Sequence, residues 1–600
     1  MTEYAFRYKL DRDDRHLHRN ALVESITSQL RNLLDVVILT QGDRELKVDG
    51  FKLLSDKASI YEIGHSEAAS PSQSLGSVAL YEPRIELIKR QLESLLSVVE
   101  LEADGAVARV KGFRLKNPSD WLVSSSGDPS EILEYAASRC NCDCIMCYNK
   151  GNPPSLALKS NKRRTIDEFK EIETRLNYFS PSEGVSLFPS LGTSWEVTAH
   201  PHFMEILRSL REKTLKPLRI TTNGKSLTTK MVDELADLKP LYLYLSLNSS
   251  SRQRRQRLMR DDKPQIAISA PKLLRDKGIP YAVVIVPWPV DSIGEMCDDL
   301  HKTIIYADDC GAHLVEVNLP GYSRWFSPQE MFNLDEVWKA CVSTVRGLRE
   351  ETGCPIVAMP TMYEENLYEQ HKNLPRIIGL VQNSPAARSG LRKGDIITAI
   401  NNIPVRTRPQ ARDMLSMLQK GEYKQADLTV DREHQKLTVK INLGDLSYPF
   451  TKAFDKHVGI TFMGTGLRPS YIERLKEMID EHRAKDVLFL SSALVRPTFE
   501  QCLRESRLLD SADLKINIEV PQNSYFGGNI FMGDLLVVQD FIDCIKEYLL
   551  RAHEPDLIVI PSSPFALGDW KRDLTGRVYL DIEREVGIPV RLLDCDIIYD

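Results

Sequence analysis

The chain has 600 residues, 42% of them apolar and 27% charged, and a chain of this length and composition holds about four folded domains. Lys and Arg number 78 against 84 Asp and Glu, a net charge of −6, which argues against a protein built to coat nucleic acid or an anionic membrane. No apolar run approaches the roughly 18 residues of a membrane-spanning helix, so no membrane partner is expected. The N-terminal residues are charged and lack the pattern of a secretory signal, so none is expected. Four of the eleven cysteines lie within eight residues, which predicts a cytoplasmic protein with reduced thiols and one cofactor site.

The first 120 residues contain an internal repeat. QLRNLLDVVIL returns as QLESLLSVVEL and VDGFKLL returns as VKGFRLK, both at an offset of 62 positions. Each copy has the pattern of an amphipathic helix, over 20–34 and 82–96, followed by two short alternating strands. One such unit can hardly bury its own apolar face, so we expect the two copies to pack on each other. We therefore predict a duplicated α+β domain over 1–120, with a structural role favoured over recruitment or dimerisation.

Residues 131–362 alternate between β-rich runs and helical patterns, which predicts right-handed βαβ units in a parallel sheet or barrel. The predicted strands lie near 132–138, 185–188, 218–222, 241–247, 281–286 and 314–318. Residues 370–445 have short strands with Gly and Pro turns. Residues 446–600 return to α/β alternation, with strands near 487–490, 515–520 and 557–561. In parallel α/β folds the loops after the strands form the active site, so functional motifs are expected there.

Four cysteines lie in the loop that follows the predicted strand 132–138, in the sequence CNCDCIMCY from Cys140. Thiolates spaced this closely are metal ligands more often than packing residues. Zinc normally takes two well-separated pairs of ligands, and one tight loop offers it poor geometry. Cys140, Cys144 and Cys147 have the spacing C-x3-C-x2-C, and three thiolates leave one iron of a 4Fe–4S cluster open to a substrate or cofactor. We interpret Cys142 as a thiol outside the ligand set.

This segment resembles the cluster loop of the radical S-adenosylmethionine (SAM) superfamily, including the aromatic residue Tyr148 after the last cysteine. The resemblance implies a partial (β/α)6 barrel in which Cys140, Cys144 and Cys147 hold a 4Fe–4S cluster whose open iron binds SAM. In that family the reduced cluster cleaves SAM to a 5′-deoxyadenosyl radical, which abstracts hydrogen from a substrate. An external electron donor, such as a flavodoxin or a ferredoxin, is implied as well.

The resemblance continues at the ends of the next predicted strands. The segment from Gly192 to Glu196 resembles the family's glycine-rich motif, although Thr-Ser-Trp stands where a second glycine is common; its glutamate would accept the SAM amino group. Asn223 belongs to a Thr-Asn-Gly turn after the third strand. Ser246 and Asn248 end the fourth strand, where the family contacts the ribose and carboxylate of SAM.

An arginine run, RQRRQRLMR over 252–260, follows the fourth strand. The resemblance implies that an arginine of this region, Arg257 in our assignment, pairs with the SAM carboxylate. A solvated face and a site for a phosphate-bearing substrate are the other interpretations. No aromatic residues interleave the run, which argues against a nucleic-acid groove.

Four further cysteines form two pairs thirteen positions apart: Cys297, Cys310, Cys341 and Cys354. They could ligate an auxiliary cluster, but each falls within or near a predicted helix and no C-x2-C pair is present. Packing in the core is therefore the favoured interpretation.

Residues 376–405 (RIIGLVQNSPAARSGLRKGDIITAINNIPV) resemble the core of PDZ domains in bacterial proteases and scaffolds. Gly390 and Gly394 fit turn positions with positive φ. The resemblance implies a small β-barrel that binds a peptide by strand addition. The upstream segment Glu364–Pro375 has no glycine-containing carboxylate loop, so peptide capture and an internal docking role both stay open.

The α/β region 446–600 resembles an uncharacterised C-terminal domain that accompanies radical SAM and PDZ segments in some prokaryotic proteins. The similar stretch is NSYFGGNIFMGD, from Asn523. Its glycines let the backbone approach a ligand closely or form a turn.

The sequence therefore predicts a radical SAM enzyme that acts on a peptide or protein brought by the PDZ-like module, or on a small metabolite. The alternative is an iron–sulfur scaffold or electron carrier that does not cleave SAM. The ordered residues Glu196, Asn223, Ser246 and Asn248 favour the enzyme, because an electron carrier has no need of them.

Overall fold

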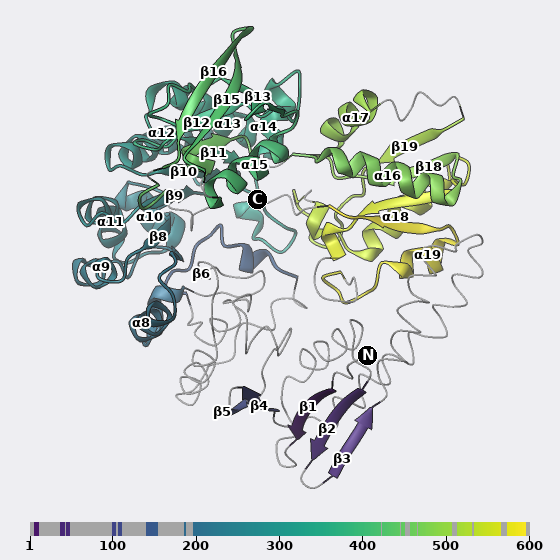
Figure 1. Cartoon of the computed structure of the whole chain (residues 1–600), viewed down its shortest axis with the longest axis horizontal. Helices are drawn as coiled ribbons and strands as arrows, with labels where there is room; N and C mark the ends of the chain where they lie inside the picture. The colour runs from purple at the N-terminus through teal and green to yellow at the C-terminus, as the bar shows by residue number, and fades with distance from the viewer. Residues whose placement is uncertain are drawn as a thin grey trace.

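The computed structural model describes residues 5–10, 36–41, 44–48, 99–103, 106–110, 140–153, 185–187, 196–421, 423–444, 446–450, 457–464, 466–506, 513–530, 533–565 and 573–595. The predicted helices 20–34 and 82–96 and the predicted strand 132–138 lie outside these residues. Within them, no helix combines the length and apolar character needed to cross a membrane. The strands of the described residues form an N-terminal sheet, a six-stranded parallel sheet, two small antiparallel sheets and a C-terminal parallel sheet (Figure 1).

The N-terminal sheet has the strand order β3-β2-β1-β4-β5. Its strands are β1 (Ala5–Leu10), β2 (Val36–Gln41), β3 (Arg44–Val48), β4 (Val99–Ala103) and β5 (Ala106–Val110). β2 with β3 and β4 with β5 are antiparallel hairpins, and the offset of 62 between the sequence repeats carries β3 onto β5. β1, which the sequence pattern did not predict, pairs parallel with β2 and antiparallel with β4. One strand outside the repeats thus joins their two hairpins.

The six-stranded sheet is parallel, and its strand order β11-β10-β9-β8-β7-β6 follows the chain. Its strands are β6 (Val185–Leu187), β7 (Leu218–Thr222), β8 (Leu241–Ser246), β9 (Tyr281–Ile285), β10 (Leu314–Asn318) and β11 (Ile356–Met359). The first five agree with the predicted strands to within one residue. β11 was not predicted. The α/β class is confirmed by this sheet and its helices.

Helices form a layer on one face of this sheet (Figure 1): α8 (Phe203–Lys213), α9 (Thr229–Ala236), α11 (Pro264–Asp276), α12 (Ile293–Asp309) and α13 (Leu334–Glu351). Alternate strand residues, such as Leu243, Val283 and Val315, are fully buried in the core that this layer shares with the sheet, as expected for side chains that alternate between faces. The opposite face of β10 presents Glu316, which is half-buried. One face of the sheet is therefore apolar and helix-covered, and the other has polar positions.

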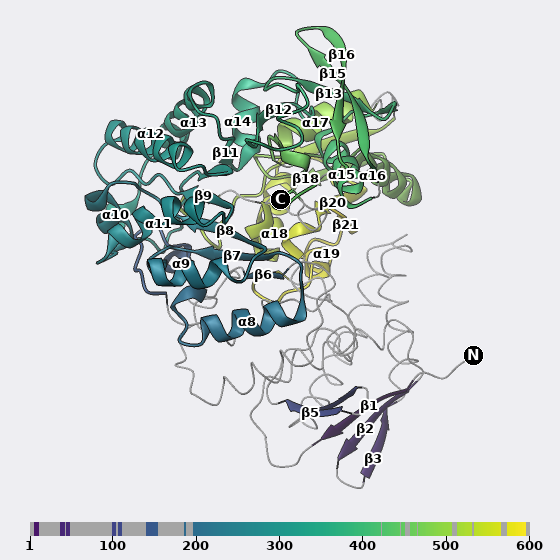
Figure 2. The ribbon, with the colours of Figure 1, turned by 60° about the vertical axis from the view of Figure 1, so that its left-hand side comes forward.

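The next region contains two small sheets. β13 (Ile396–Ile400), β14 (Ile403–Pro404), β15 (Gln425–Arg432) and β16 (Gln435–Asn442) form one, and β12 (Ile377–Leu380) and β17 (Ile460–Phe462) form the other. Gly390 and Gly394 have φ values of +90° and +91°, so the predicted positive-φ turns are confirmed. β17 lies beyond the expected boundary at 445 yet pairs with β12. The β15–β16 hairpin extends away from the six-stranded sheet (Figures 1 and 2). We call β12 to β17, with helix α15 (Arg408–Lys420), the small-sheet module.

A buried ion pair fixes this module to the six-stranded sheet. α14 (Thr361–Tyr368) follows β11 and carries Glu365, whose Oε1 lies 2.8 Å from Nη1 of Arg408 on α15. Both side chains are at most 2% exposed. The backbone N–H of Asn373 donates to Glu365 Oε1 at 2.8 Å, and that of Arg408 donates to the carbonyl of Asn373 at 2.9 Å. The connection between sheet and module is therefore a fixed junction.

Two aromatic residues make a second set of contacts. The hydroxyl of Tyr448 donates to the carbonyl of Leu241 and accepts from its N–H, at the first residue of β8. Phe450 stacks on His313, one residue before β10, with the ring centroids 6.0 Å apart. These contacts lie at the N-terminal ends of the parallel strands, opposite to the ends where ligands bind in such folds.

The C-terminal sheet is parallel, with the order β19-β18-β20-β21. Its strands are β18 (Asp486–Leu490), β19 (Lys515–Glu519), β20 (Leu557–Pro561) and β21 (Val590–Leu593), of which β21 was not predicted. α16 (Pro469–His482), α17 (Arg496–Glu505), α18 (Val538–Leu549) and α19 (Leu580–Val586) accompany them. The chain passes from β18 to β19 on one side of β18 and then crosses to β20 on its other side. The direction of the strand order therefore reverses between β18 and β20, as in doubly wound folds.

Candidate functional site

The cysteine-rich loop, residues 140–151, lies against helix α10 (Arg252–Met259). The N–H of Asp143 donates to the carbonyl of Met259 at 3.1 Å, and that of Ile145 donates to the carbonyl of Leu258 at 2.9 Å. Asp143 also pairs with Lys150 of the same loop at 2.8 Å. The arginine-rich helix therefore supports the cysteine loop, because its last residues pair with the loop backbone.

The thiols of this loop are partly or largely removed from water. Burial raises the pKa of Cys140 to about 11 and that of Cys142 to about 12, and it raises the pKa of Cys144 further. Among the described residues, no three His, Cys, Asp or Glu side chains converge as they stand to hold a metal ion. The donor set fits a cluster by its chemistry: Cys140, Cys144 and Cys147 on one loop would hold it as thiolates, and each would lose its proton on ligation.

Glu196 is a buried carboxylate, 4% exposed. Its Oε1 accepts hydrogen bonds from the hydroxyls of Thr198 and Thr222, both at 2.6 Å, and Oε2 accepts from the N–H of Asn223 at 2.7 Å. Burial raises the pKa of this carboxyl, while these donors act in the opposite direction. Glu196 thus holds the turn after β7.

Asn223 joins Glu196 to the cysteine loop. Its Nδ2 donates to Oδ1 of Asn141 at 2.8 Å and lies 3.5 Å from the sulfur of Cys140. The next residue, Gly224, has a φ of +79°, and a Cβ there would lie 2.5 Å from a methyl of Leu245. Glycine is therefore required at this position of the turn, both by its φ and by the close approach of β8.

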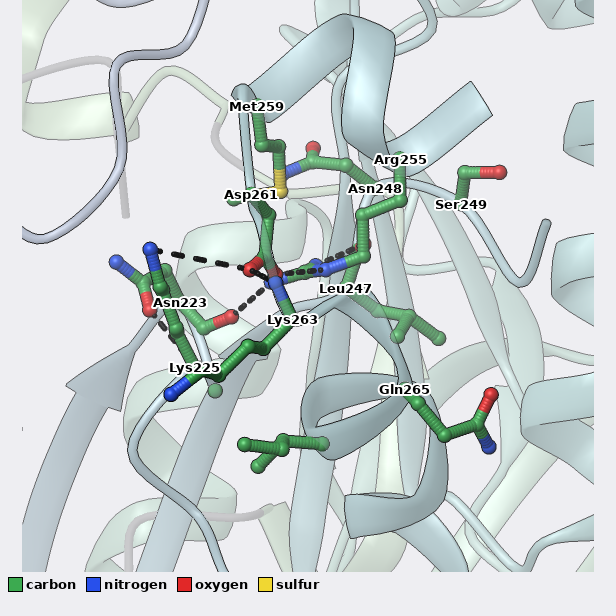
Figure 3. A network of polar contacts seen from close by, with 12 residues as sticks. Asn223, Lys225, Leu247, Asn248, Ser249, Arg255, Met259, Asp261, Lys263 and Gln265 are labelled. Carbon is green, nitrogen blue, oxygen red and sulfur yellow. Dashed lines mark hydrogen bonds and ion pairs between the residues drawn. The ribbon is translucent and has the colours of Figure 1, made fainter. Parts of the chain in front are cut away.

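A buried network behind this turn ties the strand ends together (Figure 3). Arg255 is fully buried, and its Nε lies 2.9 Å from Oδ2 of Asp261, which is also fully buried. Its other nitrogens donate to the carbonyls of Asn223 at 2.6 Å and Leu247 at 2.5 Å. Arg255 therefore clamps the ends of β7 and β8, a role that the sequence analysis did not assign to it.

Lys225 extends this network to the cysteine loop. Its Nζ donates to the carbonyl of Asn141 at 2.7 Å and pairs with Asp262. It also lies 4.0 Å from Oδ1 of Asp261. The sequence signal for Lys225 was its place directly after the Thr-Asn-Gly turn.

The remaining predicted site residues are more widely spread. Asn248 has a φ of +59°, its Oδ1 accepts from the N–H of Val286 at 2.9 Å and its Nδ2 donates to the sulfur of Met259 at 3.3 Å. The carbonyl of Ser246 accepts from Arg255 at 3.2 Å. Arg257 is 46% exposed and pairs with both oxygens of Asp291, at 2.9 and 2.6 Å. Tyr148 is 44% exposed.

The structure therefore brings Cys140, Glu196 and Asn223 into one contiguous group. Asn248 contacts Met259, the last residue of α10, and Arg257 pairs with Asp291.

In the second group of cysteines, Cys297 lies in α12 and Cys341 in α13, while Cys310 and Cys354 lie shortly after these helices. Cys341 and Cys354 belong to the main apolar core, and Cys297 packs against it. Burial raises the pKa of Cys341, Cys354 and Cys310. These positions fit the favoured interpretation of packing residues.

Family models match two segments of the chain: the radical SAM superfamily over residues 136–302 and a PDZ domain over residues 376–432. The chain thus carries a radical SAM domain followed by a PDZ domain, in the order that the motifs indicated. The radical SAM match supports both expected cofactors, a 4Fe–4S cluster and SAM.

A curated relative is the tungsten-containing aldehyde ferredoxin oxidoreductase cofactor-modifying protein of Pyrococcus furiosus. It is 31% identical over 116 residues, which span 18% of this chain and 28% of the relative. The match therefore covers less than a third of that protein.

Two solved structures are also similar. SuiB of Streptococcus suis bound to SAM is 14% identical, with a TM-score of 0.28 over 47% of this chain and 62% of that one. The radical SAM methyltransferase TsrM of Kitasatospora setae, with tryptophan and a SAM analogue, is 11% identical, with a TM-score of 0.26 over 56% and 76%. Scores this low assign neither a substrate nor a reaction to this chain.

Proposed function

We propose that this protein is a radical SAM enzyme that binds a 4Fe–4S cluster through Cys140, Cys144 and Cys147. A cluster of this kind, when bound and reduced, supplies one-electron cleavage of SAM and a 5′-deoxyadenosyl radical for hydrogen abstraction. The observation that carries the proposal is the contact of Asn223 with both the cysteine loop and Glu196. An electron carrier has no need of a buried carboxylate tied to its ligand loop.

Each residue of this group has a separate task in the proposal. Glu196 accepts a hydrogen bond from the ammonium group of SAM, a charge-assisted bond in a site shielded from water. Asn223 sets the distance between that carboxylate and the cysteine loop, since its backbone N–H donates to Glu196 and its side-chain amide donates to Asn141 of the loop. Arg255 holds the carbonyls behind the turn and makes no contact with the cofactor. Cys142 stays outside the ligand set.

The fold and the source of electrons are part of the proposal. We propose that the six-stranded sheet with its helical layer is the partial (β/α)6 barrel of the family, and that its reductant is an external flavodoxin or ferredoxin.

A peptide or protein is one candidate substrate class. The PDZ match supports it, because PDZ domains add a peptide strand to an exposed sheet edge. β17 pairs only with β12 among the described strands, so its other edge is the candidate position. The turn before β17 has positive φ at His457, Val458 and Gly459, and the N–H of Val458 donates to Oε1 of Gln419 on α15 at 3.2 Å. A peptide carboxylate that used this turn would displace the Gln419 side chain.

A small molecule is the second candidate substrate class. It is favoured by the position of the small-sheet module, which contacts β8 and the residue before β10 at the N-terminal ends of these strands. The cysteine loop, Glu196 and Asn223 belong to the opposite ends.

The test is anaerobic incubation of the cluster-loaded, dithionite-reduced protein with SAM, followed by assay of 5′-deoxyadenosine. Slow formation without substrate is expected, and its absence in a protein that holds a full cluster would exclude the proposal. Deuterated peptide and small-molecule fractions are then added separately, and deuterium in 5′-deoxyadenosine identifies the substrate class. Label from the small-molecule fraction alone would exclude a peptide substrate.

A further inference from the structure

The glycine-rich segment Asn523–Ile530, which follows β19 of the C-terminal sheet, lies against the loop that follows β10 of the six-stranded sheet. We call residues 320–326 the β10 loop. The carbonyl of Phe526 accepts from the N–H of Arg324 at 2.9 Å. Asn529 pairs with both backbone groups of Tyr322: its N–H donates to the carbonyl at 2.9 Å, and its Oδ1 accepts from the N–H at 2.7 Å.

Gly528 allows this approach. Its φ is +66°, and a Cβ there would lie 2.2 Å from the carbonyl oxygen of Tyr322 and within 2.8 Å of the Ser323 backbone. Both obstacles are backbone atoms, so a side chain at this position cannot be accommodated by a rotamer change. The glycine thus serves a close backbone contact inside the protein, a role that neither interpretation of the sequence had included.

The β10 loop in turn contacts the cysteine loop. The hydroxyl of Ser323 donates to the carbonyl of Gly151 at 2.5 Å. The ring of Phe326 covers Gly151, where a Cβ would lie 2.2 Å from a ring carbon, and it stacks on Trp288 at 5.7 Å. Cys142 and Cys144 pack against the same apolar group. The cysteine loop is therefore held between α10 on one side and the β10 loop on the other.

A second contact also joins the region of the six-stranded sheet to that of the C-terminal sheet. Nδ2 of Asn366 on α14, which follows β11, donates to the carbonyl of Leu494 after β18 at 2.9 Å. The β10 loop and helix α14 thus meet segments that follow β19 and β18. The two parallel sheets therefore contact each other through segments that follow the carboxyl ends of their strands, where ligand sites form in both kinds of sheet.

We propose that Gly528 and Asn529 are positioning residues of the SAM site, and that the C-terminal α/β unit forms part of its wall. They act through the β10 loop: the pairing with Tyr322 fixes that loop, and Ser323 and Phe326 then fix the cysteine loop. The assignment of the cysteine loop to a SAM site rests on the proposed function, whereas the mechanical coupling does not.

The test compares Gly528→Ala and Asn529→Ala with Gly587→Ala in the full-length protein, with and without its cluster. Gly587 is the matched control because its φ is +75° in the same C-terminal unit while a Cβ there meets nothing within 4 Å. Hydrogen exchange is followed in peptides covering 140–151, 320–326 and the strands β18 to β21. The electron paramagnetic resonance spectrum of the reduced cluster is recorded with and without SAM.

Both test variants should speed exchange at 320–326 and at 140–151 by about tenfold or more, with β18 to β21 unchanged, and should reduce the spectral change that SAM causes. Gly587→Ala introduces a similar positive-φ strain without the backbone contact, so it should leave exchange at 320–326 and 140–151 and the spectrum at the parent values. Faster exchange at 320–326 alone, with 140–151 and the spectrum unchanged, overturns the proposal and leaves the proposed function intact. Coupled exchange in a protein whose spectrum never responds to SAM supports the coupling and overturns the proposed function. If Gly528→Ala unfolds β18 to β21, the result for Asn529→Ala decides.

Discussion

Replacing Arg255 by Met should loosen the ends of β7 and β8 far more than any change in the exposed part of the arginine run. Met keeps much of the apolar stem but removes the guanidinium. Asp261 then stays fully buried without its partner at 2.9 Å, and the carbonyls of Asn223 and Leu247 lose donors. Breaking a buried ion pair from one side costs about 3–5 kcal/mol.

The lower part of that range applies here, because two partners of Asp261 remain. Lys225 lies 4.0 Å from Oδ1, and the N–H of Lys263 donates to it at 2.9 Å. A local loss of about 3 kcal/mol raises the exchange rate of amides that open locally by roughly 10², since each 1.4 kcal/mol is a factor of ten. Local exchange is the appropriate measure, because a chain of several domains has no single free energy of unfolding.

The assay is hydrogen exchange with mass spectrometry on peptides covering 220–226 and 244–250, with α13 as an internal reference. Arg257→Met is the matched control. The side chain of Arg257 is 46% exposed and that of its partner Asp291 is 30% exposed. Exposed ion pairs of this kind contribute about 1 kcal/mol or less to stability. Adding Asp261→Asn to Arg255→Met should restore part of the protection, because it removes the unpaired charge. Equal exchange in the Arg255→Met and Arg257→Met variants would refute the clamp.

Three further results are expected. Changing Cys140, Cys144 or Cys147 to Ala should abolish the iron and the visible absorbance of the anaerobically purified protein, while Cys142→Ala keeps them; loss in the Cys142 variant alone would contradict the ligand set. Glu196→Gln should weaken SAM binding, measured by titration calorimetry, by about 1.5–3 kcal/mol, as a charge-assisted bond is lost; an unchanged affinity would show that Glu196 only holds its turn. Arg408→Met should expose residues 366–376 to limited proteolysis, because Glu365 loses its buried partner. The exposed pair of Arg468 with Asp413 supplies the control variant Arg468→Met, and equal cleavage of both would argue against the junction.

Short-range patterns were sufficient for five of the six strands of the parallel sheet, β6 to β10, and for the motifs at their ends. β7 and β10 occupy the predicted residues because their alternating apolar positions form one buried face. β17 was missed for the opposite reason. It has three residues, Ile460–Phe462, and is defined by pairing with β12 about eighty positions earlier, which no local pattern reveals.

The arginine run shows a similar limit at the site. Its composition marked the segment, but nothing in the run distinguishes the fully buried Arg255 from the half-exposed Arg257. The difference arises because Asp261 and the carbonyl ends of β7 and β8 converge on one side of α10. A role that depends on two strand ends 24 positions apart, at Asn223 and Leu247, is visible only in the folded chain.

The Glu365–Arg408 junction bears on how this protein can be divided, in evolution or in the laboratory. A chain cut between α14 and β12 would present Glu365 to solvent without its counter-charge. It would also uncover Val357, which packs with Ile378 of the small-sheet module and with Met463 directly after β17. If either part were joined to another protein, that protein would have to supply a new surface to cover Glu365 and Val357. The PDZ domain here depends on contacts with α14 and β11 for part of its buried surface, so the two parts would have to be transferred together. Mutations on one side of the junction therefore restrict the mutations that are accepted on the other.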